Sequence, residues 1–202
     1  MPIYPLFALE KRLYNTNFTP NTEGVRGKKI YQLSSITYHL FVMKVSYINN
    51  EFQLHDLEGR FLGKLCYEKW AAYKASATTQ YAEFFDFKSK GFWQQSIAVK
   101  RDGKEIATLK MNWKGHIVID IKGNDVEQDY MLKSVGIFEN HFSLQDRSNN
   151  IILTLHPHLK WKLQNYEYDI KINPDFQNQI NETLMLIALY CANYSMMMQG
   201  AA

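Results

Sequence analysis

Cysteine is scarce in this chain of 202 residues, and neither sign of charge predominates. The two cysteines, Cys66 and Cys191, have no Cys-x-x-Cys spacing, which excludes a disulfide-rich secreted scaffold and a zinc site built from cysteine pairs. The 23 Lys and Arg against 20 Asp and Glu leave a formal charge of +3, far from the strongly basic balance of a dedicated nucleic-acid-binding domain. The first ten residues lack a basic start and a long apolar run, so we expect no secretory signal and a cytoplasmic location.

Catalytic motifs are also missing from the sequence. There is no Gly-x-Ser-x-Gly, no phosphate-cradling glycine loop and no evident nucleophile–base pair, so we predict no catalytic residue and no cofactor. His156-Pro157-His158 is the one close histidine pair, and two residues apart on a strand its rings would share a face. No carboxylate or cysteine lies nearby at ligand spacing, which favours surface histidines over a metal site.

Short segments of alternating hydrophobicity, separated by turn residues, dominate from residue 28 onward. Arg101-Asp102-Gly103 and Lys122-Gly123-Asn124 are the sharpest hairpin signals, because Asn and Gly tolerate the positive φ of tight turns. No long helix is predicted between these segments, which argues against a parallel α/β sheet. The predicted strands are residues 29–33, 38–48, 51–56, 60–67, 81–87, 93–100, 104–111, 116–121, 130–135, 137–145, 151–159 and 166–172.

Two hairpins match each other at a fixed offset of 90 residues. Residues 52–65 and 142–155 share Phe, Leu, Asp and Leu at equivalent positions, and Gly59 corresponds to Asn149. Residues 99–106 form a looser third copy. The match favours two related halves of one closed sheet, with shared turn rules as the alternative. Side-chain hydrogen bonds to the turn backbone are sufficient to explain the recurring Asp56, Asp102 and Asp146.

The C-terminal tail has a different pattern. Asn173-Pro174-Asp175 predicts a helix start, and residues 184–198 contain no charge. Fifteen helical residues rise about 22 Å, short of the ~30 Å hydrocarbon core of a membrane, so we predict no transmembrane span. A helix that is apolar on every face must be buried on every face. We therefore predict a central helix at about residues 176–199, enclosed by the sheet.

This combination resembles the tubby C-terminal-like superfamily, which includes the LURP-one-related proteins and the domain of the phospholipid scramblases. The resemblance implies a mainly β fold, a closed antiparallel barrel of about twelve strands around a buried hydrophobic C-terminal helix. It spans residues 28–202, with residues 1–27 as an extension that packs on the barrel or is partly disordered. The motifs that carry it are Phe52-x-Leu-x-Asp56-x-x-Gly59-x-x-Leu62, its echo at residues 142–155, and Tyr166-x-Tyr-x-Ile170-x-Ile172-x-Pro174 followed by the apolar tail.

The resemblance implies binding without supplying an active site. The cysteine-rich and acidic calcium-binding stretches of the scramblases are missing, and the basic cluster of tubby proteins cannot be aligned here. We therefore predict a non-enzymatic domain that binds an anionic phospholipid headgroup, that of a phosphoinositide, or a protein partner. A barrel that holds a small molecule is weakened by the helix filling its lumen, and an enzyme would need a site invisible in sequence.

Two basic clusters are the candidate headgroup sites. Lys100, Arg101 and Lys104 crowd one hairpin, and Lys160 and Lys162 flank Trp161 on a late strand. Cations beside a turn or an aromatic ring suit anionic headgroups, although a solvated strand face would look the same. Single-stranded nucleic acid would use similar residues, but the modest net charge disfavours it.

Overall fold

The computed structural model describes residues 41–68, 74–90, 96–122, 128–136, 141–160 and 165–200. All of them belong to Thr37–Ala202, the second of two compact units in the chain. The predicted strand at residues 29–33 and the predicted extension at residues 1–27 lie outside the described residues.

Twelve antiparallel strands form a closed barrel in which every strand pairs with its neighbours in sequence and β1 pairs with β12. This confirms the predicted fold class. The strands are β1 Phe41–Ile48, β2 Glu51–His55, β3 Phe61–Tyr67, β4 Ala75–Thr79, β5 Phe84–Lys90, β6 Ser96–Arg101, β7 Lys104–Met111, β8 Ile117–Ile121, β9 Gln128–Val135, β10 His141–Asp146, β11 Ile151–Lys160 and β12 Asn165–Ile172. The core is formed by the inward-facing residues of these strands and by the C-terminal helix.

Strand β4 was not predicted, because Ala-Ser-Ala-Thr-Thr carries almost no apolar signal. Small residues are required here, since Ala75 and Ala77 are buried where the barrel wall lies close to the helix. A Cβ added to Gly63 on neighbouring β3 would lie 2.8 Å from the backbone oxygen of Thr78 and 3.0 Å from Leu186 on the helix. Because the barrel wall and the helix are in close contact here, small residues occupy positions where strands usually carry large or β-branched side chains.

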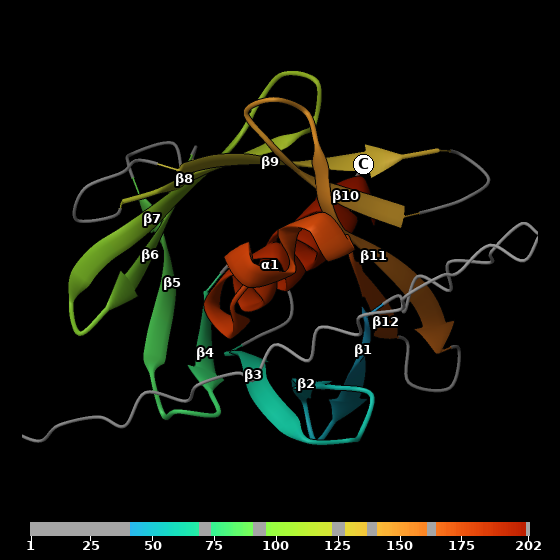
Figure 1. Cartoon of the computed structure of the whole chain (residues 1–202). Helices are drawn as coiled ribbons and strands as arrows, with labels where there is room; N and C mark the ends of the chain where they lie inside the picture. Colours follow the sequence, from blue (N-terminus) through green and yellow to red (C-terminus); the bar gives the residue numbers. More distant parts are fainter. Residues whose placement is uncertain are drawn as a thin grey trace, which may run out of the picture. The chain divides into compact units, whose positions relative to one another are not determined.

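The C-terminal helix runs through the middle of the barrel (Figure 1), as predicted, but it begins later. Asn173 caps a short 3-10 helix, η1 Pro174–Gln179, by accepting a hydrogen bond from the backbone N–H of Asp175. Ile180 is extended, and the Asn181 side chain then accepts from the N–H of Leu184, starting α1 Glu182–Gly200. The residues from 184 to 192 are all buried, so the uncharged tail forms the centre of the core.

Antiparallel pairing places successive connections at alternate ends of the barrel. The connections β2–β3, β4–β5, β6–β7 and β10–β11 share one end with the start of α1, where Gln80 donates to Glu182 at 2.7 Å. We call this the α1-entry end. Strands β1, β3, β5, β7, β9 and β11 finish at the opposite end, which we call the α1-exit end.

The turns after β2 and β10, which match in sequence, also match in hydrogen bonding. Asp56 Oδ1 accepts from the N–H of Arg60, and Asp146 Oδ1 accepts from that of Asn150. Gly59 and Asn149 both take positive φ. Asn112 builds the same kind of turn after β7 without any sequence match, so turn chemistry alone explains these aspartates.

Candidate functional site

The β6–β7 hairpin carries the first predicted cluster, and acidic groups surround it. Arg101 Nη1 lies 2.9 Å from Glu83 Oε1 on the adjacent β4–β5 turn. Lys100 stands opposite Asp86 on β5 and Glu105 on β7. Within the part of the chain that the structure describes, Lys100 and Lys104 form no ion pair. Two of the three predicted cations therefore remain available to a ligand, at a location rich in carboxylates.

Glu105 neutralises two further lysines beside this hairpin. Its carboxylate lies 2.6 Å from Lys122 Nζ and 2.9 Å from Lys90 Nζ, and it also accepts from the Thr108 hydroxyl. These hydrogen bonds, that of Lys122 first, lower the pKa of Glu105 to about 2. The wall around β5 to β7 is therefore charge-compensated rather than basic.

The one residue of the second predicted cluster that the structure describes, Lys160, lies at the other end of the barrel. Lys160 pairs with Asn165 at the close of β11, which is the α1-exit end, whereas Lys162 lies outside the described residues together with Trp161. The β6–β7 hairpin is at the α1-entry end. The structure therefore does not bring Lys160 together with the cations of the β6–β7 hairpin.

A different hairpin at the α1-exit end combines cations with an exposed aromatic ring. The β7–β8 turn presents Trp113, whose side chain is 90% exposed, and Lys114, whose Nζ lies 5.0 Å from the Trp113 ring centroid. Lys110 is exposed on the adjoining strand. Residues 106–119 contain no Asp or Glu, and Lys110 and Lys114 have no acidic partner among the described residues. We call Lys110, Trp113 and Lys114 the exit-end patch.

The turn that presents this patch is well ordered by its own hydrogen bonds. Asn112 Oδ1 accepts from the backbone N–H groups of Lys114 and His116 at 2.9 and 3.0 Å. The backbone N–H of Asn112 donates to the carbonyl of His116 at 2.8 Å, and Gly115 supplies the positive φ that the turn requires. Trp113 is thus held outward on a fixed turn.

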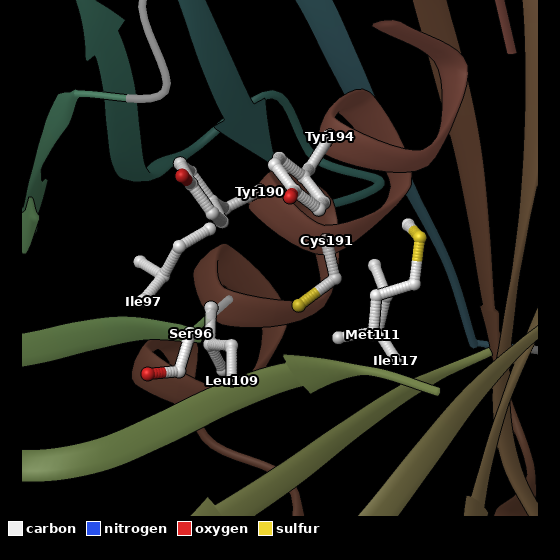
Figure 2. A pocket seen from close by; sticks show the side chains of 8 residues that line it. All are labelled: Ser96, Ile97, Leu109, Met111, Ile117, Tyr190, Cys191 and Tyr194. Atoms are coloured by element: carbon white, nitrogen blue, oxygen red, sulfur yellow. The ribbon is translucent and has the colours of Figure 1, made fainter. Parts of the chain in front are cut away.

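The base of the same hairpin packs on the second half of α1. Met111 and Ile117 lie beside Cys191 and Tyr194, around a cavity of about 10 Å³ (Figure 2). A space of that size holds about one water molecule, so it offers no room for a ligand. The hairpin is anchored to the core at its base and exposed at its tip.

Charge differs between the two ends of the barrel. Acidic residues outnumber basic ones in the described connections of the α1-entry end and in the residues that border them: Asp56, Glu58, Glu83, Asp102, Asp146, Asp175 and Glu182 against Arg60, Arg101, Lys104, Lys122 and Arg147. At the α1-exit end, Glu51 is bound by Lys64 and Glu68 by Lys74, whereas Lys110 and Lys114 have no acidic partner among the described residues. The positive end of the α1 dipole lies among the acids, as electrostatics favours.

Two larger hollows open at the α1-entry end. One of about 360 Å³ has an apolar lining that includes Leu62 and Met185, with the Arg60–Asp56 ion pair at its edge. The other, about 180 Å³, lies beside Asp129, Asp146 and Arg147. Neither is lined by histidine, cysteine or serine in an arrangement of nucleophile and base.

The reactive side chains elsewhere are poorly suited to chemistry. Burial, and then the adjacent Glu51, raise the pKa of the Cys66 thiol to about 11, and burial raises that of Cys191 still further. His158 contacts Asp169 at 3.0 Å, while His156 stacks on His141. Among the described residues, no group of three His, Cys, Asp or Glu side chains is arranged to hold a metal ion.

Comparison with the solved structures finds a distant likeness. No family model matches the chain, and no curated protein matches it. A protein of Arabidopsis thaliana solved by X-ray crystallography has a TM-score of 0.49 and 14% identity, and the match covers 74% of this chain and 89% of that one. No helix in the described part of the chain is long and apolar enough to cross a membrane.

Sequence reasoning missed the exit-end patch because it searched for dense clusters of basic residues. The signal that could have found it is a stretch without acids, residues 106–119, in which two lysines flank a tryptophan at an Asn-built turn. The absence of nearby carboxylates matters more than the number of lysines in a cluster, because the charge of a lysine beside a carboxylate is largely neutralised and attracts an anionic ligand only weakly.

Proposed function

We propose that this domain is a non-enzymatic binding module for the anionic headgroups of phospholipids, and that the exit-end patch is its binding site. The observation that carries the proposal is the pair Lys110 and Lys114, which have no acidic partner among the described residues and flank the exposed Trp113. Lysine ammonium groups attract phosphate as point charges, and each basic residue near an anionic membrane contributes about 1 kcal/mol.

The shape of the barrel supports binding at its surface rather than inside it. Helix α1 fills the lumen, so a ligand cannot enter the barrel as it does in a lipocalin. The hollow of about 360 Å³ lies at the α1-entry end, where acidic residues predominate, and an anionic ligand is repelled there. The basic α1-exit end is the surface on which an anionic headgroup is favoured.

Co-sedimentation with vesicles tests this proposal. We expect the protein to bind vesicles of phosphatidylcholine and phosphatidylserine, to ignore vesicles of phosphatidylcholine alone, and to lose affinity as salt rises, because exposed charges are screened. Replacing both Lys110 and Lys114 with Ala removes about 2 kcal/mol and weakens binding roughly 30-fold.

The matched control is the double substitution of Lys100 and Lys104 with Ala. It also removes two positive charges, but from the β6–β7 hairpin, which is adjacent in the chain and lies at the opposite end of the barrel. Retained binding in this control, with loss in the Lys110 and Lys114 variant, supports the exit-end patch. The reverse result moves the site to the hairpin predicted from sequence, and no binding to anionic vesicles at any salt rejects the lipid function and turns the search to a protein partner.

A further inference from the structure

We infer that the barrel docks end-on to an anionic bilayer, with Trp113 seated in the membrane interface and the α1-exit end facing the lipid. This inference rests on the proposed function and specifies its partner as a bilayer surface rather than a soluble phosphate.

The exposure of Trp113 is the first observation. A tryptophan buries more apolar surface than most side chains when it finds a partner, yet this one is 90% exposed, and a lysine lies over its ring. The hydrogen bonds of Asn112 fix the backbone of the turn that carries it at the tip of the β7–β8 hairpin. Tryptophan has an apolar ring and a polar N–H, and it is enriched at the level of lipid headgroups for that reason.

Other exposed apolar side chains occur at the same end. Val135, at the close of β9, is exposed. Met198, near the C-terminal end of α1, and Ile48, at the close of β1, are exposed as well. Apolar side chains at the tip with unpaired lysines beside them are the composition expected of a surface that meets an anionic bilayer.

Charge complementarity selects the bilayer as the occupant. The opposite end also exposes aromatic residues, including Tyr81 at 72%, but there they lie among acids such as Glu83, which an anionic membrane repels. The unpaired cation Lys100 of that end stands opposite Asp86 and Glu105, whereas residues 106–119, which carry the exit-end patch, contain no Asp or Glu. A protein partner needs no such coupling of tryptophan and lysine, and is an outcome of the test.

The experiment compares Trp113→Ala with Tyr81→Ala, which removes an exposed aromatic side chain from the opposite end. Binding is measured on vesicles of equimolar phosphatidylcholine and phosphatidylserine, and on inositol hexakisphosphate, which offers phosphates without a bilayer. We expect Trp113→Ala to weaken vesicle binding about tenfold, to weaken the binding of inositol hexakisphosphate by a clearly smaller factor, and to leave the melting temperature unchanged. Tyr81→Ala should match the wild type in all three measurements.

Tryptophan fluorescence provides the direct readout of insertion. Vesicles with brominated acyl chains should quench the wild-type emission more than they quench that of Trp113→Ala. Wild-type protein that fails to bind anionic vesicles would remove the proposed function altogether. Wild-type protein that binds them, with Trp113→Ala binding equally well, would retain the function and overturn end-on insertion. Equal losses of vesicle and inositol hexakisphosphate binding in Trp113→Ala would assign Trp113 to headgroup contact and also reject insertion.

Discussion

Replacement of Leu189 with Ala tests the central helix most directly. Leu189 is fully buried in the middle of α1, and strands enclose that helix on all sides. The substitution removes three carbon atoms from a position where neighbouring side chains cannot collapse without moving the barrel wall. Leu→Ala changes of this kind cost about 3 to 5 kcal/mol, because the loss of transfer free energy adds to the cost of the cavity.

Urea unfolding measures this cost. The midpoint should fall by about 1 to 2 M while the dependence of unfolding free energy on urea stays the same. Leu57→Ala is the control, because Leu57 is 63% exposed on the β2–β3 turn and its loss should change stability by less than about 0.5 kcal/mol. A loss below about 1 kcal/mol for Leu189→Ala would mean that the helix is not enclosed.

Two further outcomes follow from the contacts of the barrel wall. Lys122 and Lys90 lower the pKa of Glu105 from 4.5 to about 2, so the ionised Glu105 stabilises the fold fully above pH 4.5, and this stabilisation is lost as pH falls toward 2. In urea unfolding, the free energy of unfolding of Glu105→Gln should therefore fall between pH 4.5 and pH 2 by about 1 kcal/mol less than that of the wild type, after allowance for solvent screening. Gly63→Ala should lower the unfolding free energy by about 1 to 3 kcal/mol in the same assay, because its Cβ would lie 2.8 Å from a backbone oxygen that cannot move away cheaply; an unchanged midpoint would contradict the close packing of β3 on α1.

The fold was largely predictable because most of its strands show strong local patterns. Alternating hydrophobic residues indicated eleven of the strands. The uncharged tail predicted a helix that is apolar on every face, and such a helix can be buried on every face only inside the barrel. Asn173 misled the prediction of the helix start, since a capping side chain looks the same before a 3-10 helix as before an α-helix. Strand β4 was missed because its residues are small to make room for the nearby helix. A local sequence pattern does not reveal that the helix lies there.

The candidate site was less predictable because ion pairing depends on strand register. Arg101 meets Glu83 across 18 residues of sequence, and Glu105 gathers Lys90 and Lys122 from two other strands. A bulge between Val99 and Lys100 shifts the register of β6 on β7, so the facing charges could not be assigned by counting residues. The basic appearance of residues 100–104 in sequence therefore overstated the charge that is available to a ligand.

The parity of the strands explains which parts of the site could have been placed without coordinates. In a closed meander, two connections separated by an odd number of strands lie at opposite ends. All strands between the Asp102 turn and Lys160 were predicted, so the sequence already placed the Asp102 turn and Lys160 at opposite ends of the barrel. Omission of β4 reverses the parity for everything before it, and the Asp56 turn would then be placed opposite the Asp102 turn. Because the five residues of β4 were not predicted as a strand, the sequence assigns to opposite ends acids and cations that share the α1-entry end. The difference in charge between the two ends, on which the proposed membrane orientation depends, was therefore not predictable.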